Sequence, residues 1–237
     1  MPKRNKILVV MPTRMRPWAA LESVASILRN LSPYTYADLL LAVDHDDPKR
    51  LELTGPHIRT VIMEKRMPML HIVNYVIMPL LDEYEIFGFT GDDVRYLTKG
   101  WDTVVWNILK HNIGVVYGDD GIQHEHLPTH PWFSAALVKA VGYVSPPCLQ
   151  HYFFDNYLRE LAKAAGILYY RSDLVTQHLH HSVGGSPNDT TYSEGESKFI
   201  ADAAAFAAYL KTNLSADLQK VTAVEAVTRP GIRKPLP

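Results

Sequence analysis

The chain has 237 residues, of which 47% are hydrophobic and 21% charged, a composition that predicts a globular protein with a substantial core. Its formal net charge of -1 at pH 7 gives no general attraction to nucleic acid or to an anionic membrane. A single cysteine, Cys148, excludes an intramolecular disulfide and a multi-cysteine zinc site, and it fits a reducing, cytoplasmic compartment.

The basic N-terminus is followed by a short apolar run at residues 7–11. Five residues are too few for the apolar region of a signal peptide or for a membrane span. No later window approaches the roughly 18 uninterrupted apolar residues that a spanning helix needs. We therefore expect a soluble protein without a membrane span.

Strand-like and helix-like patterns alternate in the first half of the chain. Residues 7–11 form an unbroken aliphatic run, which is typical of a strand covered on both faces of a parallel sheet. Further strands are expected at 38–43, 60–63 and 87–93, and helices at 18–31, 69–83 and 97–110. This alternation predicts an α/β fold whose mixed, mainly parallel sheet is flanked by helices.

The second half has a more polar character. We expect strands at 113–117, 167–170 and 174–177, and helices at 132–144, 152–165 and 196–210. Residues 182–197 are rich in Gly, Ser, Asn, Asp and Thr, which predicts a mobile loop able to close over a ligand. Residues 229–237 are expected to be a disordered tail.

Polar side chains follow the first, second and fourth expected strands: Thr13, Arg14 and Arg16, then Asp44 and Asp46, then Asp92 and Asp93. The carboxyl ends of parallel strands meet at one edge of a sheet, so these side chains are expected to lie close together. Cationic loops and carboxylates at one edge could bind a diphosphate through a bridging cation. Taken one at a time, these residues are equally typical of surface arginines in loops and of aspartates that form turns.

Two common nucleotide-binding motifs do not occur in this sequence. There is no Gly-x-x-x-x-Gly-Lys-Ser/Thr phosphate loop and no Gly-x-Gly-x-x-Gly after the first strand. Walker-type ATP hydrolysis and ordinary dinucleotide redox chemistry are therefore poor interpretations.

A set of short motifs, in order, resembles the GT-A fold, family 2-like glycosyltransferases over about residues 6–205. The motifs are Val-Val-Met-Pro-Thr-Arg-x-Arg-Pro at 9–17, Val-Asp-His-Asp-Asp at 43–47, Gly-Asp-Asp-Val at 91–94, Phe-Phe-Asp-Asn-Tyr-Leu at 153–158 and His-Leu-His at 178–180. The resemblance implies a single Rossmann-like domain at 1–210 with a C-terminal extension at 211–237. Residues 6–110 would bind the nucleotide-sugar, and residues 111–210 would provide catalysis and acceptor binding. It further implies a UDP- or GDP-linked sugar donor held through Mn²⁺ or Mg²⁺.

Carried over by position, the resemblance implies four groups of site residues. The nucleotide would be bound by Pro12, Thr13, Arg14, Arg16, Asp44, Asp46, Arg66 and Asp92. The metal ligands would be Asp93 with His178, His180 or both. Asp155 stands where inverting members have a general base. The acceptor would be bound by Asp119, Asp120, His124 and Trp132.

One departure from the family pattern concerns the metal. Gly91 stands where many members have another acid, which leaves fewer ligands. The nucleotide base, the sugar, the acceptor, the oligomeric state and the choice between inversion and retention stay open at this stage.

Two other interpretations remain. The first is a metal-dependent hydrolase, whose centre would be built from Asp119, Asp120, His124, His126, His130, His178 and His180. The second keeps the fold and the donor site but has no turnover, giving a nucleotide-sugar-binding protein.

Trp132 also has a simpler interpretation than acceptor binding, because most tryptophans lie in the hydrophobic core.

Overall fold

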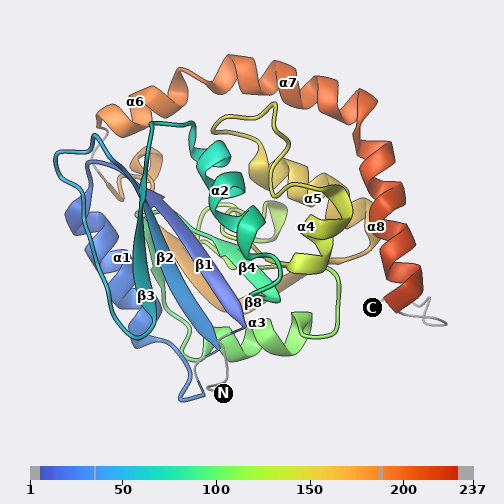
Figure 1. Ribbon diagram of the computed structural model, residues 1–237, viewed down its shortest axis with the longest axis horizontal. Helices are drawn as coiled ribbons and strands as arrows, with labels where there is room; N and C mark the ends of the chain where they lie inside the picture. The colour runs from blue at the N-terminus through green and yellow to red at the C-terminus, as the bar shows by residue number, and fades with distance from the viewer. Residues whose placement is uncertain (1–5, 35, 187–188, 229–237) are drawn as a thin grey trace.

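The computed structural model describes residues 6–34, 36–186 and 189–228, and shows a central twisted sheet with helices on both faces (Figure 1). The strands of the described residues are β1 (Ile7–Thr13), β2 (Ala37–Asp44), β3 (Ile58–Met63), β4 (Ile86–Phe89), β5 (Val94–Tyr96), β6 (Val115–Asp119), β7 (Trp132–Ser134) and β8 (Leu168–His178). The long helices are α1 (Pro17–Arg29), α2 (Met69–Ile77), α3 (Trp101–Leu109), α4 (Ala135–Val141), α5 (Phe154–Ala165), α7 (Phe199–Thr212) and α8 (Leu214–Thr228). Shorter elements are α6 (Thr190–Glu196) and the 3-10 turns η1 (Met78–Leu80), η2 (His124–His126) and η3 (His181–Val183).

Within the described residues the strands form one sheet in the order β3-β2-β1-β4-β7-β6-β8-β5. The first four run parallel, whereas β7 is antiparallel to both of its neighbours, β4 and β6. β8 runs parallel to β6 and pairs with β5 in the antiparallel sense. The expected fold class, a mixed and mainly parallel α/β sheet, is confirmed.

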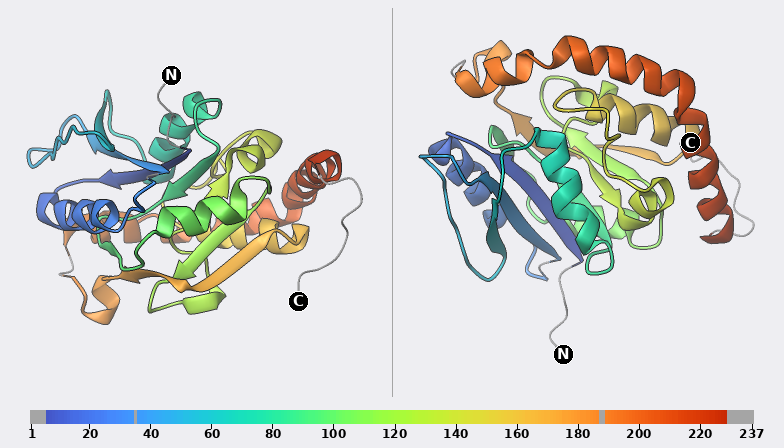
Figure 2. Two further views of the ribbon diagram at one scale, coloured as in Figure 1. Left: turned by 90° about the horizontal axis from the view of Figure 1, so that it is seen from below. Right: turned by 45° about the horizontal axis from the view of Figure 1, so that its top comes forward.

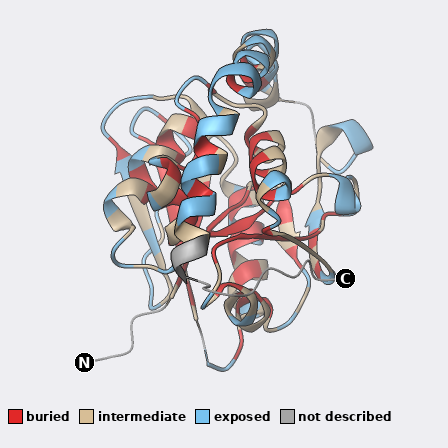
Figure 3. Cartoon of the chain, turned by 90° about the vertical axis from the view of Figure 1, so that its right-hand side faces the viewer, coloured by how far each residue is buried: buried red, intermediate tan, exposed pale blue. Residues whose placement is uncertain are grey.

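Alternation along β1 divides the core into two layers. Ile7, Val9 and Met11 face the layer that contains α1 and α3, while Leu8 and Val10 face the layer that contains α2, α4 and α5. All five side chains are fully buried. Figure 3 shows the consequence, buried strands between helices whose outer faces are exposed.

The C-terminal helices belong to the same body. α6 and α7 arch over one side of the molecule, and α8 packs against α4 and α5 (Figures 1 and 2). α8 lies beyond residue 210, where the sequence analysis ended the domain, yet its Val221 is fully buried in the core. None of the helices in the described ranges is long and apolar enough to cross a membrane.

Several elements differ from the expectations. The strands expected at 167–170 and 174–177 form the single strand β8, and the helix expected at 69–83 ends at Ile77, where η1 follows. Residues 132–134 begin a strand rather than a helix, because β7 fills the gap between β4 and β6 before the chain turns into α4. Ser134 caps that helix by accepting a hydrogen bond from the Leu137 amide at 3.3 Å. The expected strand at 87–93 ends at Phe89, and the expected loop at 182–197 contains η3 and α6. The tail at 229–237 lies outside the described residues.

Candidate functional site

The carboxyl ends of β1, β2 and β4 meet at one edge of the sheet, as parallel pairing requires. There the Thr13 hydroxyl donates a hydrogen bond to Asp92 at 2.8 Å, between residues 79 positions apart in the chain. Pro12 is part of β1, immediately before Thr13. Polar residues that follow different strands are therefore neighbours in space.

Arg14 connects this edge to the end of β2. Its guanidinium donates to Asp46 at 2.6 and 3.3 Å and to Asp44 at 3.2 Å. Asp44 is buried, and among the described residues its Oδ1 atom has no hydrogen-bond partner. Burial raises the pKa of Asp44, although the nearby charge of Arg14 opposes the rise. The Oδ1 atom is also buried, so a ligand could reach it only after the surrounding side chains move.

Arg16 is the most heavily engaged cation of the edge. It donates to Asp92 at 3.3 Å and to Asp189 at 2.7 and 2.6 Å. Its guanidinium also lies 3.9 Å from the centre of the Tyr192 ring. Asp189 and Tyr192 come from α6 and its N-cap, so the C-terminal region covers this edge of the sheet.

Asp92 and Asp93 lie in the turn between β4 and β5, and their pKa values are shifted in opposite directions. Burial, reinforced by the charge of Asp93, raises the pKa of Asp92 to about 6 despite the nearby Arg16. Burial also acts to raise the pKa of Asp93, but contacts with His178 and Tyr192 outweigh it and hold that pKa well below its usual range. Asp93 therefore stays ionised at neutral pH.

His178 reaches Asp93 through strand pairing. It ends β8, and its register partner on the antiparallel strand β5 is Val94, the residue after Asp93. The His178 Nε2 atom lies 3.4 Å from Asp93 Oδ2, and the Leu179 amide donates to the Asp93 carbonyl at 2.8 Å. On the other side of the ring, Nδ1 lies 4.0 Å from Asp120 Oδ2.

His180 stands beside this pair without touching Asp93. Its ring centre is 5.2 Å from that of His178 and 5.0 Å from that of Tyr192, and its Nδ1 atom shares a hydrogen bond with the Ser182 hydroxyl at 2.8 Å. The Tyr192 hydroxyl donates to Asp93 at 2.7 Å. Among the described residues, no three His, Cys, Asp or Glu side chains form a ready-made metal cage.

Asp155 lies in the first turn of α5 and is partly exposed. Its Oδ1 atom accepts a hydrogen bond from the Asn156 amide at 2.8 Å. Burial raises the pKa of Asp155, and the charges of Arg159 and His178 oppose the rise. A carboxylate with a raised pKa is suited to accept a proton.

Two residues expected to bind an acceptor are not positioned to do so. Trp132 is fully buried and stacks on Trp101 with ring centres 5.6 Å apart, so its ring offers no surface to a ligand. Asp120 is buried, and its Oδ1 atom accepts bonds from the amides of residues 122–124 while Oδ2 accepts one from Thr129. Its carboxylate organises the loop instead.

The remaining predicted positions lie near the surface. Asp119 and the exposed His124 form a pair with 2.8 Å between Oδ1 and Nδ1. Arg66 forms an ion pair with Glu194 of α6. Both pairs stay available to a ligand because their members are partly or fully exposed.

The histidines of the alternative hydrolase centre come together only in part: His130, His178 and His180 are ring neighbours, whereas His124 and His126 stand apart from them. His124 and His126 are exposed in η2, whereas His130 is buried with its ring 4.6 Å from that of His178. Burial lowers the pKa of His130 to about 3, so the ring is neutral. Neither of its nitrogens has a hydrogen-bond partner among the described residues.

A scan against protein-family models and a search of curated protein sequences found no match. Solved structures do match. One match is Staphylococcus aureus TarS 1-349 in complex with UDP, with which 72% of this chain aligns at a TM-score of 0.54 and 16% identity. Another is the mannosyltransferase PcManGT from Pyrobaculum calidifontis in complex with GDP-Man and Mn²⁺, with which 99% of this chain aligns at a TM-score of 0.53 and 13% identity.

A third match is GalNAc-T7 with UDP, GalNAc and Mn²⁺, where the TM-score is 0.59, the identity 8% and the covered share of this chain 75%. The chain spans 36% of full TarS, 59% of TarS 1-349, 78% of PcManGT and 44% of GalNAc-T7. The fold is therefore that of GT-A glycosyltransferases, as the sequence motifs predict.

Proposed function

We propose that this protein is a glycosyltransferase that moves a sugar from a nucleotide-diphospho-sugar to an acceptor hydroxyl with the help of a divalent cation. The observation that carries the proposal is the joint placement of Arg16, Asp92, Asp93 and His178 at one strand-end edge of a GT-A fold. Support also comes from the nucleotide and nucleotide-sugar complexes of the structural neighbours. The type of transferred sugar is left to experiment.

The nucleoside would lie over the ends of β1 and β2. Pro12 and Thr13 would line its pocket, and the base would donate a hydrogen bond to the exposed Asp46 or, once its buried Oδ1 atom becomes accessible, to Asp44. Arg14 and Asp46 would hold that carboxylate in place. Arg16 and Arg66 would supply positive charge toward the diphosphate.

Asp93 and His178 fit a Mn²⁺ or Mg²⁺ ion. Their facing atoms are 3.4 Å apart, close to the roughly 3 Å between adjacent ligands of an ion with bonds of about 2.1 Å. Such ions are held by one or two protein carboxylates together with substrate phosphates and water, so a complete protein cage is not needed. His180 is a further candidate ligand. The ion would stabilise the charge that develops on the departing diphosphate.

Asp155 would act as general base in an inverting transfer. Its carboxylate would take the proton of the acceptor hydroxyl as that oxygen bonds to the anomeric carbon. The bond from the anomeric carbon to the diphosphate oxygen would break, and the nucleoside diphosphate would leave with the electron pair. Asp119 and His124 would contact the acceptor.

The test is to incubate the protein with a mixed pool of UDP- and GDP-sugars and Mn²⁺, and to follow by mass spectrometry which donor is consumed. Thermal shifts with UDP or GDP should show stabilisation that requires Mn²⁺ or Mg²⁺ and is lost in Asp93→Ala. Asp173→Ala is the matched control, because Asp173 is exposed and its carboxylate pairs with Arg171 on the same strand, away from the strand-end edge. Consumption of no donor, together with no metal-dependent shift, would refute the proposal.

A further inference from the structure

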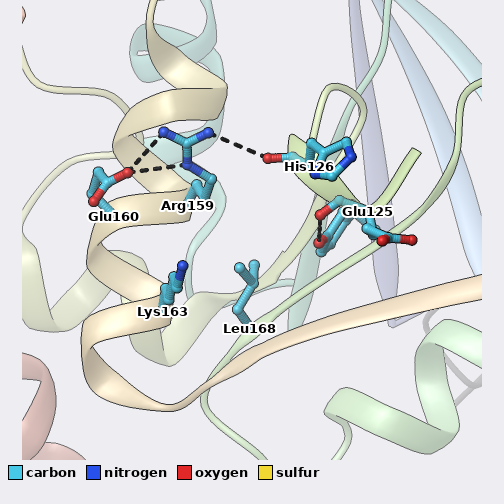
Figure 4. Close-up of a pocket in the computed structure, with 7 residues that line it drawn as sticks. Glu125, His126, Arg159, Glu160, Lys163 and Leu168 are labelled. Atoms are coloured by element: carbon cyan, nitrogen blue, oxygen red, sulfur yellow. Dashed lines mark hydrogen bonds and ion pairs between the residues drawn. The ribbon is translucent and has the colours of Figure 1, made fainter. Parts of the chain in front are cut away.

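A cavity of about 440 Å³ lies between α5, η2 and the start of β8, away from the strand-end edge that holds Arg16 and Asp93 (Figure 4). It is lined by charged and aromatic side chains, and Leu168 is the aliphatic residue among them. Its volume falls within the range of about 300–1,000 Å³ that is typical of small-molecule sites. Nothing in the proposed donor site uses this space.

Two residues that line the cavity, Arg159 and Lys163, lie on the same helix as Asp155. Arg159 and Lys163 follow Asp155 at steps of four residues, which places the three side chains on neighbouring parts of one face. The helical rise puts them roughly 6 and 12 Å beyond Asp155 along the axis. A molecule whose hydroxyl meets Asp155 would have to extend roughly 6 Å along α5 to reach Arg159 at the cavity.

Of the charged side chains that line the cavity, Arg159 and Glu160 are held by hydrogen bonds, whereas Lys163 and Glu125 form no ion pair within the described residues. Arg159 donates to Glu160 at 3.0 and 2.8 Å and to the His126 carbonyl at 3.3 Å, which ties α5 to η2. Lys163 points into the space between them in Figure 4. Within the described part of the chain, the Lys163 ammonium and the Glu125 carboxylate have no ion-pair partner.

The pattern of charge selects the chemistry of the ligand. Two acids, Glu125 and Glu160, oppose two bases, Arg159 and Lys163, so an anion or a cation would meet like charge on one side. An apolar ligand would find little beyond Leu168. A neutral molecule with many hydroxyl groups suits both signs, because it donates to the carboxylates and accepts from the cations.

We infer that this cavity binds a neutral saccharide unit of the acceptor, so that the acceptor itself is a carbohydrate. The inference rests on the proposed glycosyltransferase function and names its acceptor class. The unit in the cavity would be the one beyond the sugar whose hydroxyl faces Asp155. Lys163 and Glu125 would be binding residues of this unit.

The experiment uses methyl glycosides of neutral disaccharides built from glucose, galactose, mannose and N-acetylhexosamines as probes. Each is added to the full-length protein with Mn²⁺ and the donor that the pool experiment identifies, and release of nucleoside diphosphate is measured. We expect at least one glycoside to raise release well above the donor-only rate. Lys163→Ala and Glu125→Gln should each raise the KM for that glycoside about tenfold, which corresponds to about 1.4 kcal/mol, because each removes a charge-assisted hydrogen bond.

Lys211→Ala, which changes an exposed lysine of α7 outside the cavity, should leave this KM unchanged. Both test residues are exposed, and their variants should keep the wild-type melting temperature.

Donor hydrolysis that no glycoside stimulates, or a stimulating glycoside with an unchanged KM in both variants, would overturn the inference and leave the proposed function standing. If no donor is consumed and no metal-dependent thermal shift is seen, the proposed function fails, and saturation-transfer NMR then tests glycoside binding in the cavity by itself. Glycoside signals lost in Glu125→Gln would then support it, and no signal with the wild type would overturn it.

Discussion

The two halves of the sheet place their functional residues by different means. At the ends of β1, β2 and β4, the backbone pairing of adjacent parallel strands alone brings Thr13 to Asp92. On the other side, Asp155 depends on contacts between distant parts of the chain. The buried Asp202 of α7 accepts three backbone hydrogen bonds from residues 150–152, directly before α5, at 2.8–3.0 Å. Strand order by itself indicates that Thr13 and Asp92 are neighbours, whereas the position of Asp155 relative to the strands depends on how α5 and α7 dock.

The largest effect is expected at Asp155, the catalytic candidate of the second half. Replacing it with asparagine removes the base, so turnover should fall about 10²- to 10⁴-fold. Binding of the nucleotide, measured by calorimetry, should persist because the donor edge is built by other strands. If nucleotide affinity fell as much as turnover, Asp155 would also contribute to the donor site, and the two halves would not act separately. Unchanged turnover would favour a retaining mechanism or another base.

The next effect tests the docking of the C-terminal helices. Asp202→Ala removes the carboxylate that accepts from the three partly buried amides of residues 150–152, and we expect the free energy of unfolding to fall by about 1–3 kcal/mol. Urea unfolding measures the change, and Asp173→Ala provides an exposed aspartate as control. A loss below about 0.5 kcal/mol, the size typical of surface substitutions, would show that α7 does not hold the loop before α5.

A pH effect tests the first half. The pKa of Asp92 is raised to about 6 from an ordinary value of 3.8, so the folded state keeps a proton that the unfolded state has released. The stability from this group is present below about pH 4 and is lost as the pH rises through about 6, by as much as about 3 kcal/mol. The pKa of Asp93 is lowered, so it titrates below this window.

The check is urea unfolding of the wild type and Asp92→Asn at several pH values between about 4 and 7. Since asparagine cannot titrate, the stability of the wild type should fall relative to the variant as the pH rises. Asp173→Asn serves as the exposed control. Parallel pH profiles for wild type and Asp92→Asn would contradict the assignment.

The smallest effect concerns the contact that joins the halves, between Tyr192 of α6 and Asp93. Tyr192→Phe removes the hydroxyl that donates to Asp93 at 2.7 Å, at a cost of about 1–2 kcal/mol in stability. The ring and its contact with Arg16 remain. If this hydroxyl competes with the metal, the variant should bind Mn²⁺ and nucleotide more tightly. Weaker binding would instead show that Tyr192 helps to build the site.

Most of the fold follows from the sequence, with identifiable exceptions. The aliphatic runs and helical spacings locate β1 to β4 and α1 to α3 within a few residues, because buried parallel strands and amphipathic helices have strong periodic patterns. Residues 132–134 do not, because three apolar residues cannot distinguish a strand from the start of a helix. Residues 190–196 read as a loop because their polar composition lacks an apolar face.

The sequence by itself determined which chemical groups stand at the ends of the strands, since Arg14, Asp44, Asp92 and Asp93 each follow a recognisable buried run. Only the tertiary structure decided their partners. Asp189 lies 173 positions from Arg16 and Tyr192 lies 99 positions from Asp93, and no local pattern encodes such contacts. It also decided that Trp132 and Asp120 belong to the core and to a loop turn. The physical reason is that periodicity records only whether a side chain is buried, whereas the neighbours it meets depend on how strands pair and helices dock.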